Sequence, residues 1–477
     1  MTTRRAFLQV AATIAGSAVL PGIEGRASNP RARVFTPEMF GAKGDGTTND
    51  SDALAALGTA VSANGGGIVR FRRATYRVGR QTPTGDAEAP YSFAPAKLLE
   101  ISGCRDPVTI LGNGARIVCE PGLRYGIFRP DGTPAPHGGA YIGPGIATPY
   151  QYMLKVEGCT GPVEIRDLEL DGNVSTLVIG GTYGDTGWQI PAIGLALVDN
   201  AGPELVRNLH CHHHAEDGLL INGIDTATAE PVARRIVSVR CEGNGRQGCS
   251  IVGGRGYRFD RCSFSRTGRA GLSSMPGAGF DIEAEGVKTV RDLRFADCDF
   301  SDNVGCGLVA DTGDSEGAEF ARCTFVGTTS WSAWPNKPHF TFRDCSFVGP
   351  LVRAYGDADA ARSTRFIDCI FTDDPALSPT GRIYGGENPD RPLADLYDTR
   401  NVLFRGCRFE ATHEGTLPWS MHVIYENCRM RQRRPEISKP RGTYLGRNVI
   451  EGRANLTGST IVGEVRLNGR VHAATRL

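Results

Sequence analysis

A short pattern that recurs along the chain constrains the fold of this 477-residue protein more than any other feature of its sequence. In nearly all its copies the pattern is a pair of apolar or polar residues, a cysteine, one further residue and an apolar residue, as in Asp297-Cys298-Asp299-Phe300, Arg322-Cys323-Thr324-Phe325 and Asp344-Cys345-Ser346-Phe347. Strand-like segments follow one another every 20 to 38 residues from about Leu98 to Met430. Repeats of this length cannot bury an apolar face alone, so neighbouring repeats stack. The sequence therefore predicts a solenoid whose coils are built from strands.

The glycines that open four of these strands predict how neighbouring coils align. Residues 209–218 match residues 239–248 without a gap, so that Gly218 falls on Gly248. Extending the alignment places four strands in register, at residues 218–222, 248–252, 279–283 and 307–311, with 30, 31 and 28 residues between their glycines. Gly271 offers a competing start for the third strand. We prefer Gly279, because it keeps the spacing even and makes residues 267–277 a loop.

Composition narrows the classes of partner. A formal net charge of +1 with 22% charged residues gives no electrostatic case for nucleic acid as a general partner. Beyond the N-terminal segment, no run reaches the ~20 apolar residues of a membrane-spanning helix. The 14 cysteines include no Cys-x-x-Cys, which argues against a zinc framework. We interpret the recurring ones as a stack of small, buried, reduced side chains, namely Cys241, Cys262, Cys298, Cys323, Cys345, Cys369, Cys407 and Cys428.

The first 27 residues resemble a twin-arginine signal peptide. Thr3-Arg4-Arg5-Ala6-Phe7-Leu8 is similar to the export motif, and a weakly apolar run follows from Val10 to Leu20. Gly25 and Ala27 are small residues that suit a signal peptidase, so we expect cleavage after Ala27. The resemblance implies a periplasmic or secreted protein that folds in the reducing cytoplasm before export, in keeping with unpaired cysteines.

Residues 40–78 resemble the beginning of a known group of proteins. A glycine turn, Phe40-Gly41-Ala42-Lys43-Gly44-Asp45-Gly46, precedes an expected helix from about Asn49 to Ser62, a Gly65-Gly66-Gly67 stop and two strands. The arrangement is similar to the N-terminal cap of the pectate-lyase-like, rhamnogalacturonase/epimerase-like right-handed parallel β-helix family. That family usually has Pro-Pro-Gly where this chain has Arg72-Arg73-Ala74, a change that a surface turn can absorb.

The resemblance implies an all-β fold, a right-handed parallel β-helix with a short N-terminal capping helix. The expected organisation is a signal peptide at residues 1–27, a cap at 28–80, the β-helix at 81–430 and C-terminal coils or a cap at 431–477. The resemblance also implies a polysaccharide partner. It leaves the chemistry and the oligomeric state open, since the same cap begins hydrolases, lyases, epimerase-like proteins and phage tailspikes.

One of the predicted strands alternates apolar and acidic side chains. Phe280 and Ile282 point to one side of it, and Asp281 and Glu283 to the other. Acids side by side on an exposed face repel, so a purely structural strand rarely carries them. With coils ~4.8 Å apart, the register places Glu283 beside Asp311. Glycosidases use such carboxyl pairs, and we predict hydrolysis of a glycosidic bond with Asp281 as acid and Glu283 or Asp311 as base.

Two alternatives to the hydrolase stay open. The same three carboxylates suit a calcium ion, whereas the hydrolase needs no cofactor. The family resemblance implies that a calcium-dependent, pectate-type lyase removes the C5 proton of a uronate with a basic residue, for which the candidates are Arg255, Arg269 and Lys288. The third function is a non-catalytic, glycan-binding β-helix of the tailspike type.

We expect the substrate groove to follow the strands that begin at the four glycines. The predicted substrate-binding residues are Glu216, Asp217, Asn222, Gln247, Arg255, Arg269, Lys288, His213, His214 and Trp188. The run from His210 to His214 looks like a metal site, but strand alternation splits it between two faces and no second cluster completes a coordination shell. We therefore predict no metal there and interpret His213 and His214 as turn residues that border the groove.

Overall fold

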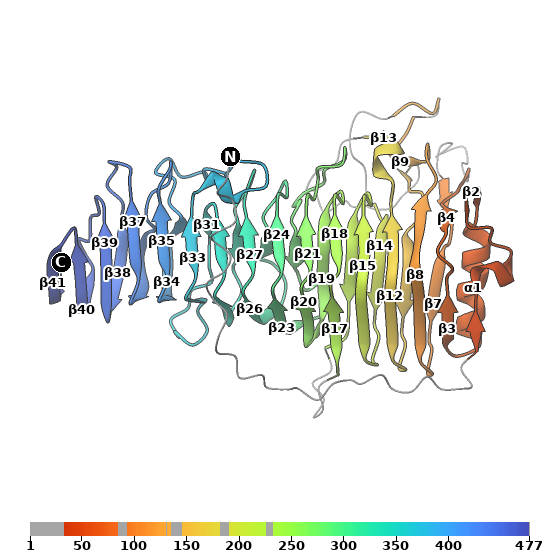
Figure 1. Cartoon of the computed structure of the whole chain (residues 1–477), viewed down its shortest axis with the longest axis horizontal. Coiled ribbons are helices and arrows are strands. Elements are labelled where there is room, and N and C mark those ends of the chain that lie inside the picture. Colours follow the sequence, from red (N-terminus) through yellow and green to blue (C-terminus); the bar gives the residue numbers. More distant parts are fainter. Residues whose placement is uncertain are drawn as a thin grey trace, which may run out of the picture. The chain divides into compact units, whose positions relative to one another are not determined.

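The computed structural model describes residues 33–83, 93–129, 131–134, 146–181, 190–225 and 232–476. The predicted signal peptide, the predicted cleavage site and Trp188 lie outside these residues. Residues Val34–Leu477 form one compact unit, and its strands wind in successive coils that pair with the coil before and the coil after (Figure 1). The pairing is parallel along the coils, so the chain is the parallel β-helix that the repeats predict.

The coils contribute strands to three parallel ladders, which we call faces 1, 2 and 3. Long strands bend and belong to two faces. Face 1 contains β7 (Leu99–Ser102), β11 (Tyr152–Glu157), β14 (Ile193–Val198), β16 (Asp217–Asn222), β19 (Gln247–Arg255), β22 (Phe280–Ile282), β25 (Leu308–Ala310), β28 (Ala333–Pro335), β31 (Leu351–Val352) and the first parts of β34 (Ala394–Arg405), β36 (Trp419–Glu426) and β38 (Pro440–Leu445).

The strands of faces 2 and 3 lie on the other two sides of each coil. Face 2 contains β1 (Val34–Phe35), β3 (Gly67–Arg70), β17 (Arg234–Val237), β20 (Tyr257–Asp260), β23 (Val290–Ala296), β26 (Ser315–Ala321), β29 (Phe340–Arg343) and β32 (Arg365–Ile367). Face 3 contains β2 (Asp45–Asn49), β4 (Thr75–Val78), β18 (Arg240–Glu242), β21 (Ser263–Ser265), β24 (Asp299–Ser301), β27 (Thr324–Val326), β30 (Ser346–Val348), β33 (Ile370–Thr372), β35 (Arg408–Ala411), β37 (Arg429–Gln432) and β39 (Arg447–Glu451). Both include parts of β8 (Val108–Cys119), β12 (Val163–Asp171), β15 (Glu204–His212) and β40 (Thr460–Leu467). The last parts of β34, β36 and β38 belong to face 2.

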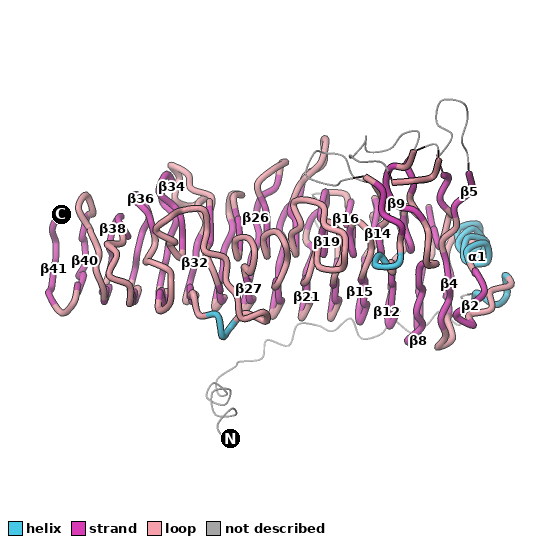
Figure 2. The backbone as a smooth tube through the Cα atoms, turned by 90° about the horizontal axis from the view of Figure 1, so that it is seen from above, coloured by secondary structure: helices cyan, strands magenta, loops and turns pink. Residues whose placement is uncertain are grey.

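The remaining elements lie at the ends of the coils and beside them (Figure 2). β41 (Arg470–Arg476) pairs antiparallel with β40. A second, five-stranded sheet consists of β5 (Gln81–Pro83), β6 (Phe93–Pro95), β9 (Arg124–Ile127), β10 (Ile146–Ala147) and β13 (Val178–Gly180). Three single turns of 3₁₀-helix are η1 (Pro37–Phe40), η2 (Val174–Thr176) and η3 (Pro375–Leu377). Within the described residues, no helix is both long and apolar enough to cross a bilayer.

The pairing register confirms the alignment predicted from the four glycines. In face 1, Leu219 pairs with Cys249, Cys249 with Phe280 and Phe280 with Leu308. Each of these residues follows its glycine directly, so the glycines are aligned. The stretch between β21 and β22 is described throughout and has no strand, so residues 267–277 form the predicted loop and Gly271 stays outside the ladder.

Two ladders of stacked phenylalanines fill the interior. Consecutive rings in each ladder lie 4.4 to 5.4 Å apart. On face 2 these are Phe259, Phe295, Phe320, Phe342, Phe366 and Phe404, and on face 3 they are Phe264, Phe300, Phe325, Phe347, Phe371 and Phe409. Phe280 meets Phe259 and Phe295 edge-on, at 5.1 and 5.0 Å. The aromatic interior holds β22 in place and leaves its alternate side chains on the outer surface.

A left-handed residue before the repeated cysteine turns the chain from face 2 to face 3. Arg322, Asp344 and Asp368 have φ of 54°, 53° and 54° at this corner. Asn and Asp tolerate this conformation better than other side chains, which accounts for several of the polar residues in the repeat. All 14 cysteines are buried and unpaired, as predicted. The grouping of Cys241 with the corner cysteines is wrong, because Cys241 lies within β18 and pairs with Phe264 of β21.

A helix lies where the sequence predicts one, at the end of the solenoid that precedes β7 (Figure 1). α1 (Ser51–Ala63) buries Leu54, Leu57 and Val61 in the core. A Cβ atom at Gly58 would stand 2.3 Å from the carbonyl oxygen of Glu100 in β7. Glycine at this position therefore lets the helix approach the first coils closely.

Candidate active site

The acidic strand lies on face 1 with its acids on the outer side, as predicted, but Asp281 is not exposed. Phe280 and Ile282 point inward. Asp281 lies between Ser250 of β19 and Val309 of β25, yet only 3% of its surface is exposed. A small apolar cluster packs on the same outer side, formed by Ala278, Cys306, Val309, Trp331 and Trp334. The prediction of an exposed acid is wrong for Asp281, because side chains from neighbouring coils and loops cover it.

Arg246 is the centre of the acidic cluster, and it is a residue that sequence reasoning missed. Its Nη1 lies 3.8 Å from Asp217 Oδ2, and its Nη2 lies 3.8 Å from Glu283 Oε2. Burial lowers the pKa of Arg246, but the charges of Asp217, Glu216, Asp281 and Glu283 outweigh it and raise the pKa. One guanidinium therefore faces four carboxyl groups. Aligning Gly218 with Gly248 also aligns Glu216 with Arg246, a signal that was present in the sequence.

Gln247 holds the carboxyl of Asp281. Its Nε2 donates to Asp281 Oδ2 at 2.6 Å, and its Oε1 accepts from the backbone N–H of Ala278 at 3.0 Å, which fixes the orientation of the amide. Burial raises the pKa of Asp281 well above its usual range, and the charges of Glu283 and Asp311 raise it further. Burial and the neighbouring negative charges therefore favour the protonated form of Asp281.

Glu216 and Asp217 form the second half of the cluster. Burial raises the pKa of Glu216 well above its usual range, and it raises that of Asp217 to about 6 against the opposing charge of Arg246. Ser250 Oγ donates to Asp217 Oδ2 at 2.7 Å. Glu216 Oε2 and Asp217 Oδ1 are among the buried oxygens that have no hydrogen-bond partner in the described part of the chain. Buried acceptors in this state suit a ligand that brings hydroxyl donors.

Glu283 marks the side on which the cluster opens to solvent. Its side chain is 32% exposed, and it accepts a hydrogen bond from Thr312 Oγ1 at 2.9 Å. Lys337, also missed from the sequence, donates to the carbonyl oxygen of Gly313 at 2.8 Å. Burial lowers the pKa of Lys337, although Asp311, Asp314 and Glu283 oppose the shift. The open side thus combines carboxylates with a lysine that releases its proton more readily than usual.

The structure brings only some of the other predicted residues to this cluster. Lys288 contributes to the electrostatics of Glu285, and its Nζ binds Asp199 Oδ1 at 2.6 Å and the carbonyl oxygen of Asn222 at 3.1 Å, at the edge of the site. Arg269 is held elsewhere, by the carbonyl oxygens of Asp302 and Asn303 and by Thr328 and Thr329. Neither side chain faces Asp281 as a free base.

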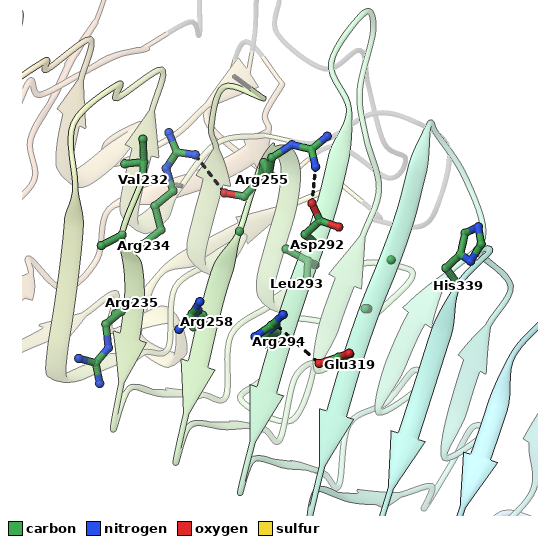
Figure 3. Close-up of a pocket in the computed structure, with 14 residues that line it drawn as sticks. Val232, Arg234, Arg235, Arg255, Arg258, Asp292, Leu293, Arg294, Glu319 and His339 are labelled. Carbon is green, nitrogen blue, oxygen red and sulfur yellow. Dashed lines mark hydrogen bonds and ion pairs between the residues drawn. The ribbon is translucent and has the colours of Figure 1, made fainter. Parts of the chain in front are cut away.

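Arg255 belongs to a different surface, a hollow of about 690 Å³ over face 2 (Figure 3). It forms ion pairs with Asp225 and Asp292. Arg235 of β17, Arg258 of β20 and Arg294 of β23 stand on successive rungs of the same hollow. Like charges on neighbouring rungs repel. The hollow is therefore a basic surface separate from the acidic cluster.

The two predicted histidines lie away from the acidic cluster. His214 is 0% exposed, and it lies against Tyr150 Oη at 2.8 Å and the carbonyl oxygen of Leu170 at 3.1 Å. Burial lowers its pKa to about 3. His213 lies near Asp171 of β12 instead. His214 is therefore a core residue, and His213 belongs to a third surface.

A positive charge already lies beside the carboxylates that were predicted to suit a calcium ion. Calcium needs several ionised or neutral oxygen donors around one point. Here burial raises the pKa of Asp281, and the guanidinium of Arg246 already lies 3.8 Å from Glu283. A calcium ion at this cluster would therefore have to share Glu283 with a guanidinium.

Comparisons with known proteins found solved structures with a similar fold. No family model matches the chain. The N-terminal fragment of gene product 12 of bacteriophage Phi29 is 13% identical, with a TM-score of 0.50 over 92% of this chain and 72% of that one. The A-module of the mannuronan C-5 epimerase AlgE4 of Azotobacter vinelandii is 15% identical, with a TM-score of 0.49 over 90% of this chain and 100% of the module. The likeness to the Phi29 fragment is one of fold.

A short sequence match points to a further protein. A capsule KN3-specific depolymerase of Klebsiella phage KN3-1 is 56% identical over 45 residues. The match spans 9% of this chain and 6% of the phage protein.

Proposed function

We propose that the chain cleaves glycosidic bonds in a polysaccharide by hydrolysis at the acidic cluster of face 1. The observation that carries the proposal is the difference between two neighbouring carboxyl groups. Asp281 is buried and hydrogen-bonded to Gln247, and burial raises its pKa, whereas Glu283 is partly exposed beside it. A pair that differs in this way divides the roles of acid and base, as glycoside hydrolysis requires.

In the proposed reaction, Asp281 gives its proton to the oxygen of the leaving sugar. Gln247 occupies Asp281 Oδ2, which leaves the other oxygen to carry the proton. Glu283 or Asp311 takes a proton from the water that attacks the anomeric carbon, so that the bond to the leaving oxygen breaks as the bond to water forms. Asp217, Glu216 and Asn222 supply acceptors for sugar hydroxyls along the neighbouring coils.

The short match to a phage capsule depolymerase supports a polysaccharide as the substrate class. The elongated ladder on which the cluster lies also suits a polymer, because residues on successive coils follow one line across the surface.

A second candidate function rests on Lys337. Burial lowers the pKa of this amine, which makes its neutral, proton-accepting form more accessible than in an ordinary lysine, and the amine lies in the field of Asp311 and Glu283. In a polysaccharide lyase or a C5 epimerase, Lys337 would remove the C5 proton of a uronate. Loss of the leaving sugar oxygen would then complete a lyase reaction and create a double bond, whereas return of a proton to the opposite face would complete epimerisation.

The test is digestion of a panel of capsular and uronate-containing polysaccharides, followed by mass analysis of the products. Hydrolysis creates reducing ends without ultraviolet absorbance of an unsaturated uronate. Asp281→Asn and Glu283→Gln should each lower turnover at least ~100-fold, the usual contribution of general acid–base catalysis. Glu319→Gln, which changes an exposed acid of face 2, is the matched control and should leave turnover unchanged.

Three outcomes distinguish the candidates. Unchanged turnover in both acid variants, with circular dichroism showing an intact fold, would contradict the proposed site. Absorbance of an unsaturated uronate that disappears in Lys337→Gln would establish the lyase. Binding to a glycan without any product would leave only the non-catalytic, tailspike-type function.

Two structural expectations complete the proposal. We infer that residues 1–27 direct export through the twin-arginine route, which would bring the enzyme to extracellular polysaccharide. We also infer that α1 caps the first coils, because it covers their apolar interior with Leu54, Leu57 and Val61.

A further inference from the structure

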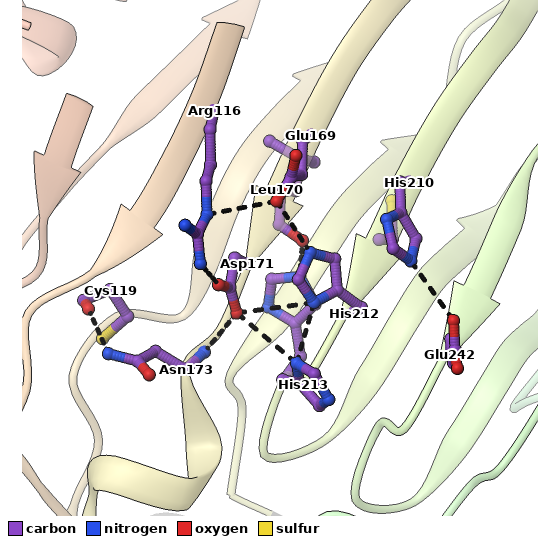
Figure 4. A network of polar contacts seen from close by, with 12 residues as sticks. Arg116, Cys119, Glu169, Leu170, Asp171, Asn173, His210, His212, His213 and Glu242 are labelled. Atoms are coloured by element: carbon purple, nitrogen blue, oxygen red, sulfur yellow. Dashed lines mark hydrogen bonds and ion pairs between the residues drawn. The ribbon is translucent and has the colours of Figure 1, made fainter. Parts of the chain in front are cut away.

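A group of histidines and acids lies on face 3, away from the acidic cluster (Figure 4). The register between β12 and β15 places Glu169 opposite His210 and Asp171 opposite His212. His210 and His212 point outward, while Cys211 between them is buried in the core. Strand alternation thus separates Cys211 from the histidines, as predicted. The neighbouring coil supplies the acids that the sequence alone did not place beside them.

Three ligand atoms converge at one point of this group. His212 Nδ1 lies 2.8 Å from His213 Nδ1 and 3.6 Å from Asp171 Oδ1, and His213 Nδ1 lies 3.8 Å from the same oxygen. Ligands at the usual ~2.0 to 2.2 Å from a tetrahedral zinc ion are separated by roughly 3.3 to 3.6 Å. The two distances to Asp171 are close to these values, whereas the 2.8 Å between the imidazole nitrogens is that of a hydrogen bond, which an ion between the rings would replace.

The place where these three ligand atoms converge has more lone pairs than hydrogen-bond donors. His212 Nε2 lies 3.2 Å from Glu169 Oε1, so a neutral His212 that donates there leaves a lone pair on its Nδ1. That lone pair lies near Asp171 Oδ1, which is also an acceptor. A neutral His213 can place at most one N–H among His212 Nδ1, His213 Nδ1 and Asp171 Oδ1, so at least two of these atoms have only lone pairs to offer one another.

The surrounding residues resemble the outer shell of a metal site. A carboxylate on the far nitrogen of a ligating histidine fixes its ring and its tautomer, and Glu169 does this for His212. Arg116 binds Asp171 Oδ2 and lies 3.1 Å from Glu169 Oε1, while the backbone N–H of Asn173 donates to Asp171 Oδ1 at 2.8 Å. Asp171 and His212 are thereby held in place before any ion binds.

We propose that Asp171, His212 and His213 bind a divalent transition metal ion of the zinc class. Two imidazole nitrogens and one carboxylate oxygen form the ligand set, which is typical of such ions and differs from the all-oxygen set of calcium. The side chain of His213 is 45% exposed, so the ion can enter from solvent and keep an open position there. The ion ties the coil of β12 to the coil of β15 in addition to any chemistry at the open position.

The test is binding of Co²⁺ and Zn²⁺ to the full chain, prepared without a polyhistidine tag. Titration with Co²⁺, followed by visible absorption, should show saturable binding of one ion per chain without the ultraviolet band of a cobalt–thiolate bond. Zn²⁺ should displace the cobalt and raise the melting temperature. The absence of the thiolate band separates this site from the 14 cysteines.

Variants decide whether the ion binds at this point. Asp171→Asn and His213→Asn should abolish saturable binding, and asparagine suits the left-handed conformation of residue 213, whose φ is 56°. Glu169→Gln should weaken binding about 10–100-fold, as loss of an outer-shell carboxylate does. His422→Gln, which changes an exposed histidine of β36, is the control and should bind as the parent does. Absence of saturable binding in the parent, or equal binding in Asp171→Asn and His213→Asn, would overturn the proposal.

Discussion

Asp217→Asn should make the protein more stable at alkaline pH, although it replaces a residue of the proposed site. Burial raises the pKa of Asp217 from 3.8 to about 6. Between these values the folded chain holds a proton that the unfolded chain has lost. The stability of the parent therefore falls as pH rises from about 4 to about 6, and the loss is complete above the folded pKa. An asparagine cannot ionise and escapes this loss.

The size of the effect follows from the shift. A difference of roughly 2 pKa units corresponds to about 3 kcal/mol at ~1.4 kcal/mol per unit. With an unfolding entropy of about 2.1 cal/mol/K per residue, a chain of this length gains about 3 °C in melting temperature. Asparagine keeps an oxygen that accepts the hydrogen bond from Ser250 Oγ, so the substitution preserves the local geometry. The electrostatic interaction between Glu216 and Asp217 broadens the pH range over which stability changes, because the two acids titrate together.

The assay is thermal unfolding by circular dichroism from pH 4 to pH 8 for parent and variant. The two melting temperatures should coincide near pH 4 and diverge toward pH 8, with the variant higher. Asp225→Asn is the control of opposite sign. Burial raises the pKa of Asp225, but its bonds to Arg255 and Thr289 outweigh burial and lower it, so its loss should destabilise the protein at neutral pH and matter less on acidification. A less stable Asp217→Asn variant at pH 8, or a difference independent of pH, would refute the reasoning.

Two further predictions concern the solenoid itself. Arg258→Glu should stabilise the chain by about 0.5 to 1 kcal/mol in urea unfolding, because it replaces like charges on successive rungs with opposite ones. Arg70→Glu is the control and should not stabilise the chain, because Arg70 lies outside this row of three arginines. A destabilised Arg258→Glu variant would show that the arginines serve another structural purpose. The native protein should resist labelling by a thiol reagent, and denaturation without reductant should expose all 14 thiols, since every cysteine is buried and unpaired. Rapid labelling of the native chain would contradict the buried cysteine stack.

Features that repeat with the coil could be predicted from the sequence. The aligned glycines at positions 218, 248, 279 and 307 predicted the pairing that places Leu219, Cys249, Phe280 and Leu308 on one line. The alternation in β22 predicted which side chains point inward. Both features depend on local periodicity and on contact with the nearest coil, and the same residue pattern recurs in successive repeats. The error at Cys241 arose because its local sequence resembles that of the corner cysteines, although Cys241 lies in the strand position that Phe264 occupies in the next coil.

The candidate site was predicted in part. Asp281, Glu283 and Asp311 followed from the register, and their electrostatic coupling in the structure agrees with their closeness. Arg246 was missed although the aligned glycines place it opposite Glu216, and Lys337 was missed because it belongs to no alternating strand pattern. Arg255 and Arg269 share the coils of the acids, but their side chains engage other surfaces.

The sequence by itself determined the solenoid, its register and the row of acids, because stacking of short repeats leaves few other ways to bury their apolar residues. Only the tertiary structure decided that Asp281 is covered, that Arg246 stands among the carboxylates and that Asp171 meets His212 across coils. The physical reason is that burial and charge on an outer face depend on loops and on neighbouring coils. Residues that contact there, such as Asp171 and His212, can lie 41 positions apart in a pattern that carries no local sign of the contact.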